Sequence, residues 1–165
     1  MAHNNWILPI HIISSGDVKR LKRELEQLDE FIKQSNLRKP GTFLDKLPKT
    51  SRSLSDFGEL NKLNLLVEKD RLVAIEFLIN LIAKAPVVNI GLATEPSVVF
   101  MTKIAAWFRN NINPLIIINF GLEPTIAAGC TVRTLNKFHD FSLRKHFDAQ
   151  HPLLLSKIKE SSTQV

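Results

Sequence analysis

The segment from Pro86 to Phe147 constrains the fold of this 165-residue chain more than any other part of the sequence. Short runs rich in β-branched residues alternate there with one amphipathic stretch and two tight turns, a pattern typical of alternating strands and helices. We expect strands over 87–93, 115–122, 130–135 and 138–141, and one helix over 97–111. The first two strands should be parallel and joined by a right-handed crossover, whereas the last two should form an antiparallel hairpin.

Details of this segment carry further expectations. The near-continuous apolar character of the first strand predicts burial on both of its faces. Thr94 should cap the helix that follows, with Pro96 in its first turn. Ser142 is in position to cap a last helix, which Pro152 should interrupt.

The first helix is predicted between Asp17 and Gln34, where apolar residues recur at helical spacing. Ser15 is in position to cap it, and the carboxylate of Asp17 suits its first turn. The segment 36–53 that follows contains Pro, Gly and five basic residues, which predicts a loop.

Two more helices should precede Pro86. Ser53 and Ser55 offer the start of the second, and Asp70 opens the third, which is the most apolar helix of the chain. The helical spacing of its aliphatic residues predicts one buried stripe. The members of this stripe are Leu72, Ile75, Leu78, Ile79 and Ile82, and Val73, Phe77 and Leu81 widen it.

These elements together predict an α+β fold. Residues 1–85 should form a reduced helical N-terminal region that includes the basic loop at 36–53. Residues 86–165 should form a small domain with a mixed β-sheet, built from a strand–helix–strand unit, an antiparallel hairpin and a C-terminal helix. The run from Trp6 to Ile13 is apolar but lacks the basic leader and cleavage site of a signal sequence, so we expect it to pair with a sheet edge or pack on a helix.

Composition excludes several classes of protein. Hydrophobic residues make up 44% of the chain and charged residues 23%, which is typical of a globular protein. Cys130 is the only cysteine, so an internal disulfide is impossible and a secreted disulfide scaffold is excluded. No run is long and apolar enough to predict a membrane-spanning helix, and we expect a soluble intracellular protein.

The net charge of +6 comes from 22 basic and 16 acidic residues. Each half of the chain about Pro86 carries a similar excess, so no basic arm or tail stands out. One alternative reading is a basic nucleic-acid-associated α/β module that uses the loop at 36–53 together with Arg133, Lys137, Arg144 and Lys145. Its aromatic partners, Phe138 and Phe141, should lie partly on opposite faces of the sheet, and we do not expect nucleic-acid binding.

Few residues have the spacing that catalysis would require. Glu95 and Glu123 follow two parallel strands, where α/β proteins often bind ligands, and they leave a small-ligand enzyme open as a second alternative. Capping of the next turn or helix explains both carboxylates more simply. The histidines complete no metal set, Gly129 is explained by a close backbone approach or a bulge, and no phosphate-binding glycine motif is present. We therefore expect no catalytic, cofactor or metal site.

The order of the motifs in the C-terminal half points to a known family. An aliphatic strand at Leu115–Ile118 precedes an acidic-Pro turn at Glu123-Pro124 and an Ile-Gly-Gly-like segment at Ile126–Gly129. A strand with Val132-Arg133, a hairpin, and Asp140–Arg144 complete the set. This arrangement resembles the C-terminal domain of the delta subunit of F-type ATP synthases, which is called the oligomycin sensitivity-conferring protein in mitochondria. Phe141 and the alanines of Ile126–Gly129 replace small residues or glycine of the family pattern.

The resemblance implies a non-catalytic peripheral-stalk (stator) subunit that links the catalytic head to the b-subunit stalk during proton-driven ATP synthesis. The implied partners are the C-terminal helix of the b subunit and the N-termini of the alpha subunits. The implied location is the cytoplasmic face of the plasma membrane, as a peripheral part of a membrane-bound complex. Because the N-terminal region is shorter than the family's six-helix bundle, the stalk contact follows from the resemblance more directly than the head contact.

The expected stalk-facing surface belongs to the last helices. Helix-in-groove recognition needs apolar residues at helical spacing, which the C-terminal segment supplies. An alternative is that the same residues only close the internal core. The candidate partner-binding residues are Leu143, Phe147, Leu154, Leu155 and Ile158.

Overall fold

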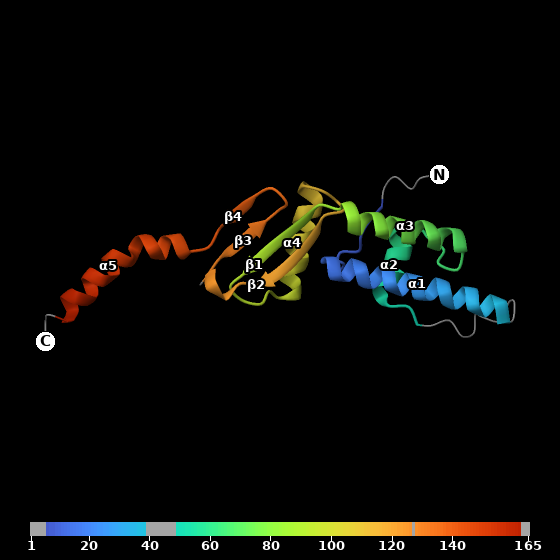
Figure 1. Ribbon diagram of the computed structural model, residues 1–165, viewed down its shortest axis with the longest axis horizontal. Helices are drawn as coiled ribbons and strands as arrows, with labels where there is room; N and C mark the ends of the chain where they lie inside the picture. Colours follow the sequence, from blue (N-terminus) through green and yellow to red (C-terminus); the bar gives the residue numbers. More distant parts are fainter. Residues whose placement is uncertain (1–5, 39–48, 127, 163–165) are drawn as a thin grey trace. The chain divides into compact units, whose positions relative to one another are not determined.

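The computed structural model describes residues 6–38, 49–126 and 128–162 of the chain (Figure 1). The described residues form an α+β fold, as predicted, in which helices precede a four-stranded mixed sheet. In chain order, the elements are α1 (Ser15–Arg38), α2 (Arg52–Leu60), α3 (Glu68–Lys84), β1 (Val87–Leu92), α4 (Val98–Asn111), β2 (Ile117–Leu122), a 3-10 turn (Pro124–Ile126), β3 (Cys130–Arg133), β4 (Phe138–Asp140) and α5 (Arg144–Ser162).

The chain divides into two compact units. Unit 1 comprises the residues up to Val87 together with Val98–Asn119, and unit 2 comprises Val88–Ser97 and the residues from Phe120 onward. The first segment of unit 1 ends at Val87, and the sequence predicted a boundary at residue 86. Helix α4 and the beginning of β2 nevertheless belong to unit 1.

The strand order in the sheet is β2-β1-β3-β4. Hydrogen bonds from Ile117 N to Pro86 O (3.0 Å) and from Glu123 N to Leu92 O (2.7 Å) advance along both strands in the same direction, so β1 and β2 are parallel. Strand β3 pairs antiparallel with both β1 and β4. The four-residue turn Thr134–Lys137 closes the β3–β4 hairpin through a 2.8 Å hydrogen bond between its ends. The parallel β1–β2 pair and the antiparallel β3–β4 hairpin therefore confirm the predicted strand directions.

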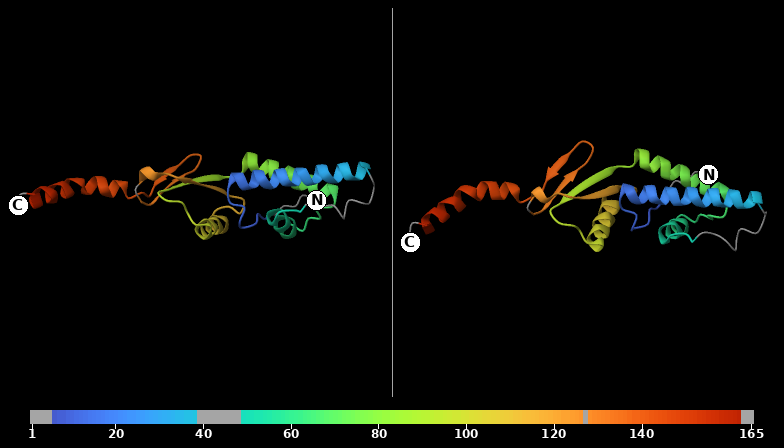
Figure 2. Two further views of the ribbon diagram at one scale, coloured as in Figure 1. Left: turned by 90° about the horizontal axis from the view of Figure 1, so that it is seen from below. Right: turned by 60° about the horizontal axis from the view of Figure 1, so that its bottom comes forward.

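The core of unit 1 lies where α1 packs along α3, with α2 and the N-terminal segment against them (Figure 2). Helix α1 buries a regular stripe of apolar side chains, which matches its predicted amphipathic pattern. Trp6 adds a stack of aromatic rings, because it lies parallel to Phe77 at 4.2 Å and to Phe57 at 5.9 Å between centroids. The N-terminal segment also reaches β2, where Ile118 N donates to Ile13 O at 2.9 Å.

The predicted buried stripe of α3 is only partly correct, because Leu78 of the stripe and Leu81 beside it are buried but other members are not. The helix buries Arg71, Ala74, Leu78 and Leu81, whereas Leu72 and Ile79 are 48% and 47% exposed. Helix α3 carries aliphatic residues around most of its circumference, so periodicity alone does not select the core-facing side. The buried ion pair of Arg71, described below, selects it instead.

The helix starts also differ from the predicted ones. Ser14, rather than Ser15, caps α1: the Asp17 N–H donates to Ser14 Oγ at 3.2 Å, and Ser14 N donates to Asp17 Oδ2 at 2.9 Å. This reciprocal pair is a capping box, with Asp17 in the first turn as expected. Helix α4 begins at Val98, too far along the chain for Thr94 to cap it.

Strand β1 and helix α5 provide two further corrections. Only Val88 and Ile90 of β1 are buried, and Asn89 is exposed, so the strand buries one face rather than two. Helix α5 is continuous, with Pro152 inside it, although we expected an interruption there. A proline removes a single backbone hydrogen bond, which a long helix tolerates at the expense of local stability. The helix starts at Arg144, so Ser142 is not its cap.

Candidate docking surface on helix α5

The five predicted partner-binding residues are all exposed. Their exposed fractions range from 44% at Leu143 to 62% at Phe147. A large part of the surface of each residue therefore remains in contact with solvent. The alternative interpretation, that these five residues only close the internal core, does not agree with their exposure in this structure. The exposed members are Leu143, Phe147, Leu154, Leu155 and Ile158.

Three of these residues form one narrow stripe. At roughly 100° per residue, Phe147, Leu154 and Ile158 fall within about 40° of one another around the helix axis, and Leu143 immediately precedes the first residue of the helix. Leu155 widens the stripe on one side. Contiguous apolar surface of this kind marks an interaction site more often than scattered exposed leucines do. We call these five residues the α5 stripe.

The start of α5 is fixed to the sheet by backbone contacts. Leu143 N donates to Ala128 O at 3.0 Å, and Phe147 N donates to Leu143 O at 3.0 Å as the first turn of the helix. Gly129 makes this approach possible. Its φ is +93°, and a Cβ at this position would meet Phe141 O and lie 2.9 Å from Ser142 Cα. Of the two explanations predicted for Gly129, the close backbone approach is therefore the one observed.

The carboxylate of Glu123 has a structural partner. Glu123 Oε2 accepts a 2.7 Å hydrogen bond from the Thr131 hydroxyl, which joins the end of β2 to β3. Gly91 lies directly beneath this bond, and a Cβ there would contact Glu123 Oε2 and lie 2.5 Å from Thr131 Oγ1. Glu95, its predicted counterpart in a small-ligand site, is exposed. The observed contact gives the Glu123 carboxylate a structural role between β2 and β3, rather than the predicted capping of the turn after its strand.

Metal-ligating residues do not gather in the described part of the chain. Across its three ranges, no group of three or more His, Cys, Asp and Glu side chains is placed to hold a metal ion. His139 stacks on Phe141, with ring centroids 6.0 Å apart. Cys130 is a free, half-buried thiol at the start of β3.

The residues of the nucleic-acid alternative are partly brought together. Most of the basic loop at 36–53 lies outside the described residues. On the hairpin, the Arg133 guanidinium lies 5.3 Å from the centroid of the Phe138 ring, because the two residues are cross-strand partners. Phe141 instead pairs with His139. The predicted division of the aromatic residues between the two faces of the sheet agrees with these contacts.

Two arginines, the buried Arg71 and the half-buried Arg109, were not predicted from the sequence to be part of the interior. Arg71, 1% exposed, donates from Nε to Asp29 Oδ1 at 2.7 Å and from Nη1 to the carbonyls of Leu65 and Leu66. Arg109 of α4 donates to the carbonyls of Pro9 and Ile12, and burial lowers its pKa. Asp29 lies 42 residues from Arg71 along the chain. No local pattern in the sequence could have paired them.

Comparison with known proteins adds no family to this description. No protein-family model matches the chain, and no curated protein matches it. A search of the described helices finds none that is long and apolar enough to cross a membrane.

Proposed function

We propose that this chain is a non-catalytic peripheral-stalk subunit of a rotary F-type ATP synthase. In this role it would connect the catalytic head to the stalk, with the C-terminal helix of the b subunit bound along the α5 stripe. The chain would act at the cytoplasmic face of the plasma membrane, as a peripheral component. The N-termini of the alpha subunits are the proposed partners of the helical unit 1.

The observation that carries the proposal is the exposure of the α5 stripe. A static tether needs an apolar strip that a partner helix can cover, and it needs no activated nucleophile or shifted acid. A stripe of aliphatic and aromatic residues on a continuous helix provides such a surface. The position of this helix, directly after the β3–β4 hairpin, also agrees with the order of motifs that carries the family resemblance.

A binding measurement with a matched pair of variants tests the proposal. The probe is a peptide corresponding to the C-terminal helix of the b subunit from the same organism. Leu154→Ser combined with Ile158→Ser should weaken binding at least about tenfold, because two apolar side chains lose their burial in the complex. Isothermal titration calorimetry of the full-length chain measures the change.

Leu153→Ser is the control. Leu153 is 57% exposed on the same helix, but it lies on a different side from the stripe. This variant should bind the peptide as the wild type does. Equal affinity of the wild type and the double variant would contradict the assignment of the stalk contact to α5.

A nucleic-acid-associated module is the second candidate, supported by the Arg133–Phe138 contact on the exposed hairpin. An arginine stacked on an aromatic ring can add a base to the stack. A gel-shift assay with single-stranded RNA at increasing salt tests this function. Binding at micromolar protein that weakens steeply with salt and is lost in Phe138→Ser would favour it over the stalk role.

A further inference from the structure

Helix α3 carries a second apolar stripe in addition to the one that it buries. Leu72, Ile75, Ile79 and Ile82 follow one another at spacings of three and four residues along the helix. Ile75 and Ile82 are half-buried, whereas Leu72 and Ile79 are about half exposed. Residues with this spacing line one side of a helix and match the contact pattern of a second helix packed against it.

A groove runs beside this stripe, between α3 and α1. It has a volume of about 490 Å³ and is lined by Lys19, Lys22, Arg23, Glu26, Ile79 and Ile82. The two isoleucines of α3 supply its apolar lining, and the charged residues of α1 supply the rest, which we call its wall. We call this feature the α1–α3 groove. It lies wholly within unit 1 and involves none of the residues of the α5 stripe.

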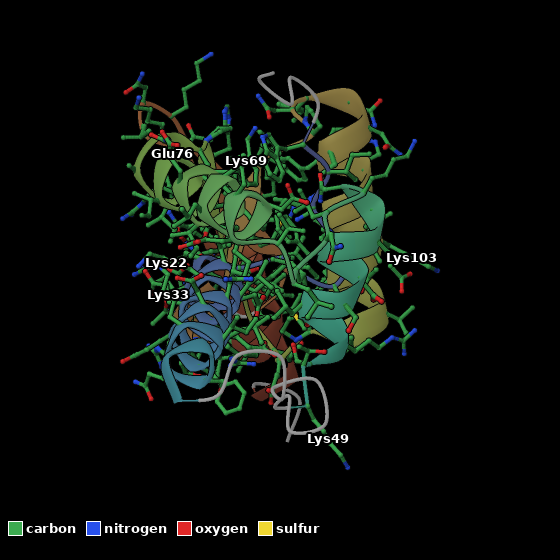
Figure 3. All side chains as sticks on the ribbon, turned by 90° about the vertical axis from the view of Figure 1, so that its right-hand side faces the viewer. Lys22, Lys33, Lys49, Lys69, Glu76 and Lys103 are labelled. Atoms are coloured by element: carbon green, nitrogen blue, oxygen red, sulfur yellow. The ribbon has the colours of Figure 1, made fainter. Side chains whose placement is uncertain are left out.

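The wall of the groove has an excess of positive charge. Lys22 pairs with Glu26 at 2.7 Å, so these two charges offset each other. Lys19 and Arg23 form no ion pair with any residue in the described ranges. Figure 3 shows Lys22 on the outer side of α1, on the side of unit 1 that also carries Glu76 of α3 and is opposite to α2. Two unpaired cations, Lys19 and Arg23, therefore line the groove together with the two isoleucines.

We propose that the α1–α3 groove binds a partner helix whose apolar face is flanked by Asp and Glu residues. The apolar face would cover Ile79 and Ile82, and the flanking carboxylates would meet Lys19 and Arg23. Helix-in-groove recognition supplies affinity through the apolar contact and register through the charges. This site is additional to the proposed stalk contact and does not depend on it.

The charge of the groove favours an acidic partner helix over the two occupants that the chain itself could supply, which are helix α5 and a second copy. The unpartnered helix α5 has four Lys or Arg residues against two Asp or Glu residues, so it would bring like charge to the groove. A second copy of the chain carries the same net charge of +6 and the same basic wall. An acidic helix from another protein is the complementary partner.

The test uses a synthetic peptide about three heptads long, with Leu at the a and d positions and Glu at the flanking positions. Fluorescence anisotropy with the full-length chain should show saturable binding that weakens at high salt, because the flanking charges are screened. A peptide with the same composition in scrambled order should not bind. Equal binding of the two peptides would overturn the proposal.

Two variants locate the site. Ile79→Ser should weaken binding about tenfold, whereas Leu60→Ser, an equally exposed position on α2, should leave it unchanged. The double variant Lys19→Glu with Arg23→Glu should no longer bind the Glu-flanked peptide and should instead bind a peptide in which Lys replaces the flanking Glu residues. Such an exchange of preference is not expected from a merely structural defect, and circular dichroism melts check that each variant folds. Unchanged preference in the double variant would overturn the proposal.

Two other occupants are outcomes of the same experiment. Vesicles that contain phosphatidylglycerol could also attract Lys19 and Arg23. Binding to such vesicles without binding to the peptide would overturn the proposal in favour of a lipid surface. A concentration-dependent dimer that Ile79→Ser abolishes would overturn it in favour of a second copy.

Discussion

Gly129 combines a backbone conformation and a confined space that other residue types do not fit. Its φ of +93° is costly for any residue with a Cβ, and the backbone at Phe141 and Ser142 occupies the position of that atom. We predict that Gly129→Ala lowers the free energy of unfolding by at least about 2 kcal/mol. Urea denaturation measures the change.

Gly121→Ala is the matched control for this prediction. Gly121 lies in β2, and a Cβ there would meet no atom within 4 Å. The substitution should leave stability unchanged or raise it by about 0.5 kcal/mol, because the unfolded chain loses freedom. Equal stability of the Gly129 and Gly121 variants would contradict the close approach at Gly129.

Asp29 is the second residue with a clear thermodynamic signature. Burial alone would raise its pKa, but hydrogen bonds from Lys33 and Arg71 outweigh burial and hold the pKa below the ordinary value of 3.8. The folded state therefore binds this proton less tightly than the unfolded state. The resulting stabilisation is complete above the ordinary value and is lost as the pH falls from about 4 through the lower folded pKa.

We predict that Asp29→Asn lowers the free energy of unfolding at pH 7 by about 3 kcal/mol, because Arg71 remains buried without its counter-charge. The variant should also lose part of the acid-dependent destabilisation below about pH 4. Urea denaturation at a series of pH values measures both effects. The double variant Asp29→Leu with Arg71→Met should recover most of the lost stability. If the free energy of unfolding of Asp29→Asn depended on pH as that of the wild type does, the proposed contribution of Asp29 to acid sensitivity would be ruled out.

At the scale of the elements, helix α3 shows that periodicity does not determine which side of an apolar helix faces the core. We predict that Leu78→Ala, in the core, costs about 3 kcal/mol of unfolding free energy, since it removes a fully buried side chain and leaves a cavity. Ile79→Ala, one position along, should change stability by less than about 0.5 kcal/mol. Thermal unfolding of the pair measures the difference. A larger loss of stability from Ile79→Ala than from Leu78→Ala would indicate that Ile79 is buried, as the sequence pattern predicted.

The sequence could predict the elements that local chemistry determines. The β-branched runs, the turn before β4 and the apolar spacing of α1 are all signals within a few residues, and the corresponding elements are present. The rotation of α3 could not be predicted, because it depends on the contact of Arg71 with a residue of another helix. The burial of one face of β1 depends similarly on which strands and helices cover it.

The candidate site was predictable only in part. The helical spacing of Leu143, Phe147, Leu154 and Ile158 is readable from the sequence. Their exposure is not, because an apolar stripe that faces a partner and one that faces the core have the same pattern. The α1–α3 groove was hidden for a related reason: its apolar residues belong to the stripe that the sequence assigned to the core.

Over the whole molecule, the two units present different surfaces for different contacts. Unit 2 carries the α5 stripe, and unit 1 carries the α1–α3 groove. A linking protein needs at least two contact surfaces, and the proposed stator role assigns one contact to the α5 stripe and the other to unit 1. The whole-molecule account therefore predicts membership of a larger assembly.

Purification of an affinity-tagged chain from its native cells tests this central claim most directly. The account predicts that the alpha and beta subunits of the catalytic head and the b subunit co-purify with it in fixed stoichiometry. The Leu154→Ser and Ile158→Ser double variant should lose the b subunit, whereas Leu153→Ser should retain it. Recovery of the folded wild-type chain without any F-type ATP synthase subunit would contradict the account.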